Sequence, residues 1–128
     1  MVIDTSAICA ILFDEPERYR FDRLIDADRV RMISAVTRVE AGFVIEGRKG
    51  QAGRQRLDRF FRLTRPEVVA VSEEQAELAV DGFRRFGKGR HRAGLNIGDC
   101  FAYALAKATG EPLLFKGDDF SLTDIVAA

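Results

Sequence analysis

The chain has 128 residues, 47% of them hydrophobic and 31% charged, so it can form one compact domain and is not a disordered tail. Twenty basic residues balance twenty acidic ones, which argues against a protein that binds nucleic acid through an overall positive charge. Two isolated cysteines and a single histidine exclude a disulfide scaffold and a zinc site built from several of these residues.

The alternation of short apolar strands with helices predicts an α/β domain over residues 1–128 with a mainly parallel sheet. The expected strands are Val2 to about Asp4, Val30–Ile33, Val68–Val71 and Leu113–Phe115. The expected helices are Ser6–Phe13, Glu15–Ala27, Ser34 to about Gly47, Gln51–Leu63, Ser72–Phe86 and Asn96–Thr109. In such sheets ligands bind beyond the carboxyl ends of the strands.

The sequence indicates neither a membrane-spanning segment nor a secretory signal peptide. No apolar run reaches the roughly 18 residues that a membrane-spanning helix needs. The first residues carry no basic leader before an apolar stretch, and two unpaired thiols suit a reducing compartment. We therefore expect a cytoplasmic protein with no membrane contact.

Acidic residues recur where strands end or helices begin. Asp4 follows the first strand, and Asp118 and Asp119 follow the last. Asp99 stands three residues after Asn96, which is the spacing of a capping box. A cap or a surface turn explains each of them equally well, and a cap and a ligand role do not exclude one another.

Glu40 is expected on an apolar side of its helix. Its neighbours three or four positions away include Val36, Phe43 and Val44. An ionised carboxylate in apolar surroundings is costly unless it is paired or binds a metal. An ion pair with Arg38 or another arginine is the alternative explanation, although nearby arginines project from other faces.

Several carboxylates brought together would repel one another and would need a cation. Because the chain lacks histidine and cysteine clusters, the ligands would all be oxygen atoms, which suits Mg²⁺ or Mn²⁺. Such an ion polarises a phosphoryl oxygen and lowers the pKa of a bound water. A phosphodiester is therefore the natural substrate.

Positive charge is concentrated in two segments. Residues 48–65 hold seven basic residues and one acidic residue. The second segment leads toward Asn96 and contains Arg84, Arg85, Lys88, Arg90 and Arg92. Contact with RNA phosphates is the hypothesis for both segments, and a solvated helix face and a mobile loop are the alternative.

Four stretches resemble the PIN-domain ribonucleases, specifically the VapC toxins of bacterial toxin–antitoxin pairs. They are residues 1–7 (MVIDTSA), 34–40 (SAVTRVE), 87–100 (GKGRHRAGLNIGDC) and 113–120 (LLFKGDDF). They follow the family's order and span essentially the whole chain. The resemblance implies a three-layer α/β/α sandwich with a parallel sheet of about five strands.

The resemblance also implies a Mg²⁺-dependent endoribonuclease, with Mn²⁺ as a possible substitute. Its implied acidic pocket consists of Asp4, Glu40, Asp99 and Asp119, with Thr5 or Ser6 and Asn96 supporting it. Asp118 is the alternative to Asp119, because Phe115 and Gly117 stand where many relatives carry a threonine and an acid. In the implied mechanism Asp4, Asp99 and Asp119 hold one or two ions, and Glu40 orients water or acts as a base.

The implied partners are an RNA substrate, a VapB-type antitoxin and a second copy of the chain. A surplus of apolar residues could serve the dimer or simply the core: Phe43, Val44, Phe60, Phe61 and Leu63. Two other functions compete with the ribonuclease. One is a catalytically inactive PIN-like module that binds RNA or protein. The other is a receiver-type phosphotransfer domain. It is disfavoured because Asp4 lies too near the N-terminus to be the phosphoacceptor, and because Lys116 is the only lysine that follows a strand as such a domain requires.

Overall fold

Four short parallel strands form the centre of the protein, which is described over all 128 residues by a computed structural model. The strands are β1 (Val2–Ile3), β2 (Met32–Ser34), β3 (Glu67–Val69) and β4 (Leu113–Leu114), in the order β3-β2-β1-β4. The expected count of about five strands is corrected to four. At the edge beside β4, Ala127 forms only a single parallel bridge to Leu113.

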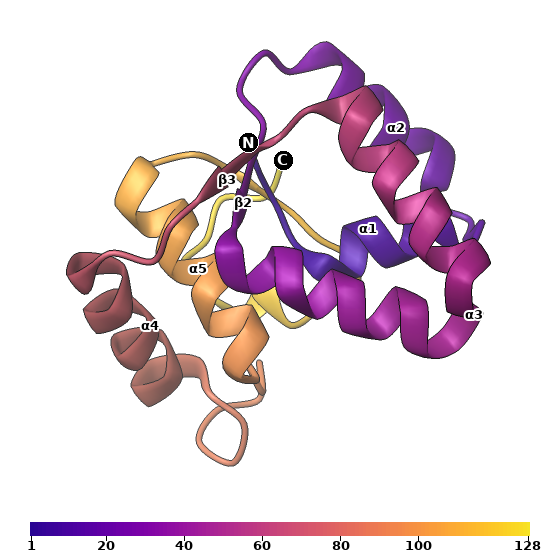
Figure 1. The fold of residues 1–128 in the computed structure, drawn as a ribbon. Helices are drawn as coiled ribbons and strands as arrows, with labels where there is room; N and C mark the ends of the chain where they lie inside the picture. The colour runs from indigo at the N-terminus through magenta and orange to yellow at the C-terminus, as the bar shows by residue number, and fades with distance from the viewer.

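Helices cover both faces of the sheet, as Figure 1 shows. They are α1 (Thr5–Leu12), α2 (Arg18–Ala27), α3 (Ala35–Thr64), α4 (Glu73–Phe86) and α5 (Ile97–Thr109), followed by the 3-10 helix η1 (Phe120–Leu122). The expectation that the second helix begins at Glu15 is wrong. Asp14 adopts a positive φ of 58°, and the chain turns through residues 15–17 before α2 begins.

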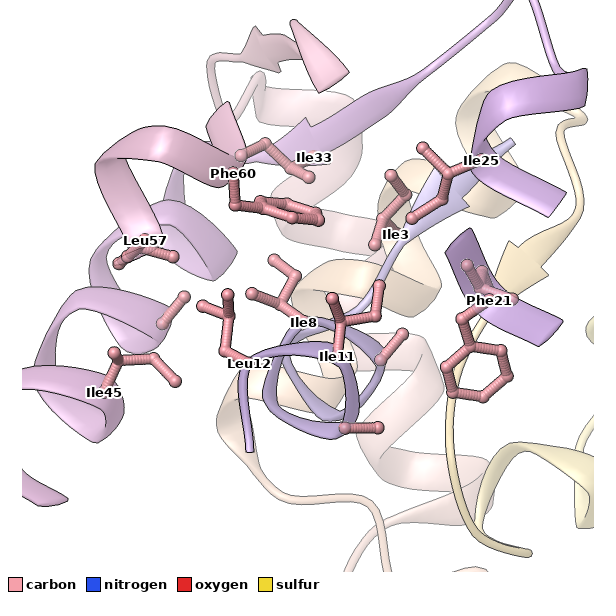
Figure 2. Packing of buried hydrophobic residues seen from close by; sticks show 14 of the residues in the cluster. Ile3, Ile8, Ile11, Leu12, Phe21, Ile25, Ile33, Ile45, Leu57 and Phe60 are labelled. Atoms are coloured by element: carbon pink, nitrogen blue, oxygen red, sulfur yellow. The ribbon is translucent and has the colours of Figure 1, made fainter. Parts of the chain in front are cut away.

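The strands divide the core into two clusters, because successive side chains point to opposite faces. Ile3 and Leu114 pack with α1, α2 and the buried side of α3. Figure 2 shows this cluster, with Ile8 and Phe60 among its members. Val2 and Leu113, by contrast, pack with α4 and α5. The three-layer α/β/α fold predicted from the sequence is thereby confirmed.

Helix α3 is bent at Gly50. This residue has φ 58° and ψ −145°, a conformation that side-chain-bearing residues rarely adopt. The two helices expected there correspond to the two halves of α3, 35–49 and 51–64, and Figure 1 shows the bend between them. Over the whole chain, no helix combines the length and apolar character needed to cross a membrane.

Candidate active site

Asp4 lies where β1 ends and α1 begins. Its backbone is extended and its Oδ2 accepts hydrogen bonds from the Ser6 amide at 2.8 Å and the Ser6 hydroxyl at 2.6 Å. The Ser6 hydroxyl also accepts a 3.0 Å bond from the amide of Lys116, which follows β4. The predicted cap is therefore present, and it uses only one of the two carboxylate oxygens.

The second oxygen of Asp4, Oδ1, is buried and has no hydrogen-bond partner, in a residue that is 2% exposed. Burial raises the pKa of Asp4, the bonds from Ser6 lower it, and the charge of Glu40 raises it further. A buried carboxylate oxygen without a partner is costly unless a cation or water satisfies it. Asp4 therefore has the environment expected of a metal ligand.

Glu40 projects from the first half of α3 and is held by α1. The Thr5 hydroxyl donates a 2.7 Å hydrogen bond to Oε2 of Glu40. The alternative of an ion pair with Arg38 is wrong, because Arg38 lies 3.9 Å from Asp58 and above the ring of Phe61. Glu40 therefore forms no ion pair with a basic side chain of the protein.

The expectation that Glu40 shares a buried apolar face is wrong in part. Val39 and Phe43 are 53% and 77% exposed, and the buried face of this half of α3 carries Thr37, Ala41 and Ile45. Glu40 lies at the border of the two faces, where it is half-buried. Its carboxylate can therefore reach both a protein partner and a ligand from solvent.

Gly98 is a site residue to which the sequence reasoning assigned no role. A Cβ at this position would lie 2.4 Å from Oε2 and 2.6 Å from Oε1 of Glu40. Only glycine lets the Glu40 carboxylate approach the first turn of α5 this closely. The available signal was a glycine in the first turn of a helix, where its low helix propensity needs a reason.

Asp99 occupies the same first turn and completes the predicted capping box. Its amide donates to Oδ1 of Asn96 at 3.0 Å, and its Oδ2 accepts from the Asn96 amide at 2.8 Å. Burial raises the pKa of Asp99 to about 6; the bond from Asn96 lowers it, and the charges of Asp4, Glu40 and Asp119 raise it. The charges of the other three predicted acids therefore all reach Asp99.

Asp119 and Asp118 differ in their surroundings although both are exposed. Asp119 precedes η1 without capping it, and its charge acts on Asp99. Asp118 instead lines a separate cavity of about 380 Å³, together with Glu17 and Arg20. This difference favours Asp119 as the fourth acid.

No three acidic, histidine or cysteine side chains converge closely enough to hold a metal ion as they stand. Asp4, Glu40 and Asp99 each use one oxygen for a hydrogen bond within the protein and keep a second oxygen. The unpartnered Oδ1 of Asp4 is the atom that most requires a cation. An all-oxygen set reached partly through water suits a small hard cation, since Mg²⁺ usually keeps several of its waters.

The basic segment before Asn96 divides into two parts. Lys88, Arg90 and Arg92 are exposed on the loop between α4 and α5. Two backbone hydrogen bonds close the base of this loop: the Lys88 amide donates to the Leu95 oxygen at 2.9 Å, and the Leu95 amide donates to the Phe86 oxygen at 3.0 Å. These three cations therefore stand on an ordered loop that leads into α5.

Arg85 is not placed as the RNA hypothesis expected. Its guanidinium bonds to Asp124 at 2.9 Å and to the Tyr103 hydroxyl at 3.3 Å, and it pairs with Asp81. It joins α4 to α5 and to the C-terminal segment. Arg84 is exposed and has no acidic partner within ion-pair distance.

Comparison with known proteins agrees with this architecture. The family model described as "PIN domain" matches residues 1–126. The chain is 51% identical to "Ribonuclease VapC30" of Mycobacterium tuberculosis, over 98% of this chain and 95% of that protein.

Two solved structures share the fold at low sequence identity. The M. tuberculosis VapC20, titled a sarcin–ricin loop cleaving toxin, matches with a TM-score of 0.79 and 19% identity over 99% of this chain and 97% of that chain. The VapBC2 complex of Rickettsia felis, bound to a promoter DNA fragment, matches with a TM-score of 0.76 and 13% identity, covering 99% and 96%.

Proposed function

The chain belongs to the PIN-domain family and, within it, to the VapC ribonucleases, and we propose that it hydrolyses RNA with Mg²⁺ at the four acids described above. Mn²⁺ is expected to substitute. The observation that carries this assignment is the buried, unpartnered Oδ1 of Asp4 beside the carboxylates of Glu40 and Asp99. None of these three acids has a cation partner within the protein, so a metal ion from solution would offset their mutual repulsion.

The residues divide the work of the reaction. Asp4, Asp99 and Asp119 would hold the ion, partly through water. When bound, the ion supplies a Lewis acid that stabilises charge developing on the phosphate. Glu40 orients the attacking water or accepts its proton, and Thr5 fixes the carboxylate for that purpose.

RNA phosphates are expected to contact the ordered loop through Lys88, Arg90 and Arg92, with Arg84 behind them. Such contacts would position the strand without selecting its sequence. Arg85 contributes instead to the fold, since its guanidinium is engaged by Asp124.

The expected partners are a VapB-type antitoxin and a second copy of the chain. Phe43 and Leu63 are 77% and 69% exposed and remain available to a partner, whereas Phe60 belongs to the core. We place the protein in the cytoplasm, where its RNA substrate lies and where the free thiols of Cys9 and Cys100 stay reduced.

The test is cleavage of a defined RNA by purified protein with and without Mg²⁺. Asp4→Asn and Asp99→Asn should each reduce cleavage by about 100-fold or more, because each removes a ligand charge. Asp118→Asn is the matched control, since it removes the same charge one residue from Asp119. Full activity of both variants would overturn the assignment of Asp4 and Asp99 as metal ligands. Wild-type protein that binds RNA without cutting it would favour the catalytically inactive module.

A further inference from the structure

Two rows of side chains lead away from the acidic site, one on α1 and one on α3. Thr5 and Cys9 lie four residues apart on α1, and Phe13 caps the C-terminus of this helix four residues later. Glu40 and Arg48 stand eight residues apart on α3. The rows meet at one end in the Thr5–Glu40 hydrogen bond and at the other where Arg48 lies above the Phe13 ring. Figure 1 shows α1 alongside the first half of α3.

The far end of these rows carries two cations close to one aromatic ring. The Arg48 guanidinium carbon is 5.3 Å and the Lys49 Nζ is 5.9 Å from the centre of the Phe13 ring. Phe13 is half-buried and packs against the core, which fixes the position of its ring. The bend at Gly50 separates both cations from the arginines of the second half of α3.

Arg48 and Lys49 are exposed, and neither lies within ion-pair distance of an acidic side chain. Several other arginines of this part of the molecule do have such partners. Arg54 lies 3.8 Å from Glu46, and Arg56 lies 3.2 Å from Asp14. The two cations above Phe13 therefore keep their charge available for an external anion.

The Cys9 thiol lies between the two ends of the rows. Burial raises its pKa to about 11; Arg48 lowers it, while Asp4, Glu15 and Glu40 raise it. Both the cationic end and the acidic end thus act on the same thiol. Eight residues of helix span about 12 Å, so the cations stand a few nucleotides from Glu40.

We infer that Phe13, Arg48 and Lys49 form a subsite for single-stranded RNA next to the cleavage position, an inference that rests on the proposed function. Arg48 presents its planar guanidinium, backed by the Phe13 ring, to a nucleobase. Lys49 contacts an adjacent phosphate. This arrangement suits a flexible single strand, because stacking on a flat surface needs unpaired bases.

The experiment measures RNA binding without cleavage, in the Asp4→Asn background. Fluorescence anisotropy of a labelled single-stranded RNA would give the Kd across a range of salt concentrations. Arg48→Ala with Lys49→Ala should raise the Kd about tenfold and lower the salt slope by about two. Arg59→Ala with Arg62→Ala is the matched control, because it removes the same charge from the second half of α3 and should change the Kd less than about twofold.

Phe13→Leu tests the aromatic surface while keeping an apolar side chain in place. It should raise the Kd about fivefold, because the support for the stacked guanidinium is lost. If the Arg59/Arg62 control weakens binding equally, the effect comes from overall charge and not from a local subsite. If the Kd of the Arg48/Lys49 variant is unchanged, these two cations do not bind RNA and are available to a protein partner. Either result overturns the subsite.

The design separates this inference from the proposed function. Wild-type protein that fails to cleave RNA would refute the nuclease assignment, although the binding comparison would still decide the subsite. Thermal unfolding of each variant shows that it is folded. If Phe13→Leu does not fold, the Arg48/Lys49 variant and its control decide alone.

Discussion

The Thr5 hydroxyl and the Glu40 carboxylate are joined by a 2.7 Å hydrogen bond between the first turn of α1 and the middle of the first half of α3. Gly98 of α5 lies directly against the same carboxylate. Three helices thus fix one side chain, and they do so directly beside Asp4. Such a constraint is useful where a carboxylate must aim at a water molecule.

Removing this hydroxyl should therefore harm the reaction more than the fold. Thr5→Val keeps the shape of the side chain but loses the donor, and we expect cleavage to fall about tenfold with a loss of about 1 kcal/mol in unfolding free energy. Single-turnover cleavage and urea denaturation measure the two effects. Thr5→Ser, which keeps the hydroxyl, should retain most of the activity; equal loss in both variants would argue against the hydrogen bond as the cause.

Gly98→Ala should displace Glu40. The new Cβ would overlap the carboxylate, which is the end of a side chain that can move once its bond to Thr5 breaks. We expect at least a tenfold loss of cleavage with a change in stability of about 1 kcal/mol or less.

Gly47→Ala is the matched control for Gly98→Ala. It introduces the same methyl group into a helix where nothing lies within 4 Å, and it should leave cleavage unchanged. A Gly98→Ala protein with normal activity would show that Glu40 does not need its observed position.

The metal-free protein should lose stability as pH rises. The pKa of Asp99 is about 6 in the folded protein against an ordinary value of 3.8, so folding favours the protonated form. The stability that this group contributes is fully present below about pH 4 and is lost as pH rises through 6. Urea denaturation at a series of pH values, in the presence of a chelator, measures the loss.

Asp99→Asn should flatten this pH dependence, because the substituted group no longer titrates. Mg²⁺ should raise the unfolding midpoint more at pH 7 than at pH 5, since the ionised carboxylates bind it better. An unchanged pH profile in Asp99→Asn would assign the titration to another group.

Substitutions of Arg85 and Arg90 should affect different properties, stability in the first case and RNA binding in the second. Arg85→Ala breaks the contacts with Asp124 and Tyr103 and should lower the unfolding temperature only slightly, because these contacts are partly exposed. Arg90→Ala should leave stability unchanged but weaken RNA binding. Thermal unfolding and anisotropy on the same two proteins give the comparison; weaker RNA binding by Arg85→Ala alone would reverse the assignment.

The sequence was most informative where chemistry and local structure coincide. Asp4 follows a strand and Asp99 stands in a capping box, and both features depend on residues within three positions along the chain. These local patterns correctly predicted the cap at Asp4 and the capping box at Asp99. The expected helix break before residue 51 was similarly local, since it depends on Gly50.

Long-range contacts were less accessible. Glu40 was selected for an apolar face that includes Phe43, yet Phe43 is exposed and the partner of Glu40 is Thr5, 35 positions away. No periodicity indicates such a pairing. The close approach of Gly98 to the Glu40 carboxylate likewise depends on tertiary packing. The same is true of the hydrogen bond between Arg85 and Asp124.

The two core clusters place the acids on separately packed layers. Asp4 and Glu40 come from the α1–α3 side, while Asp99 comes from α5 on the other side of the sheet. A cavity made in either cluster, for example by Leu105→Ala, would let one layer shift against the other before the protein unfolds. Enzyme activity should consequently fail at a lower temperature than the fold, which makes core residues far from the site a source of temperature-sensitive variants.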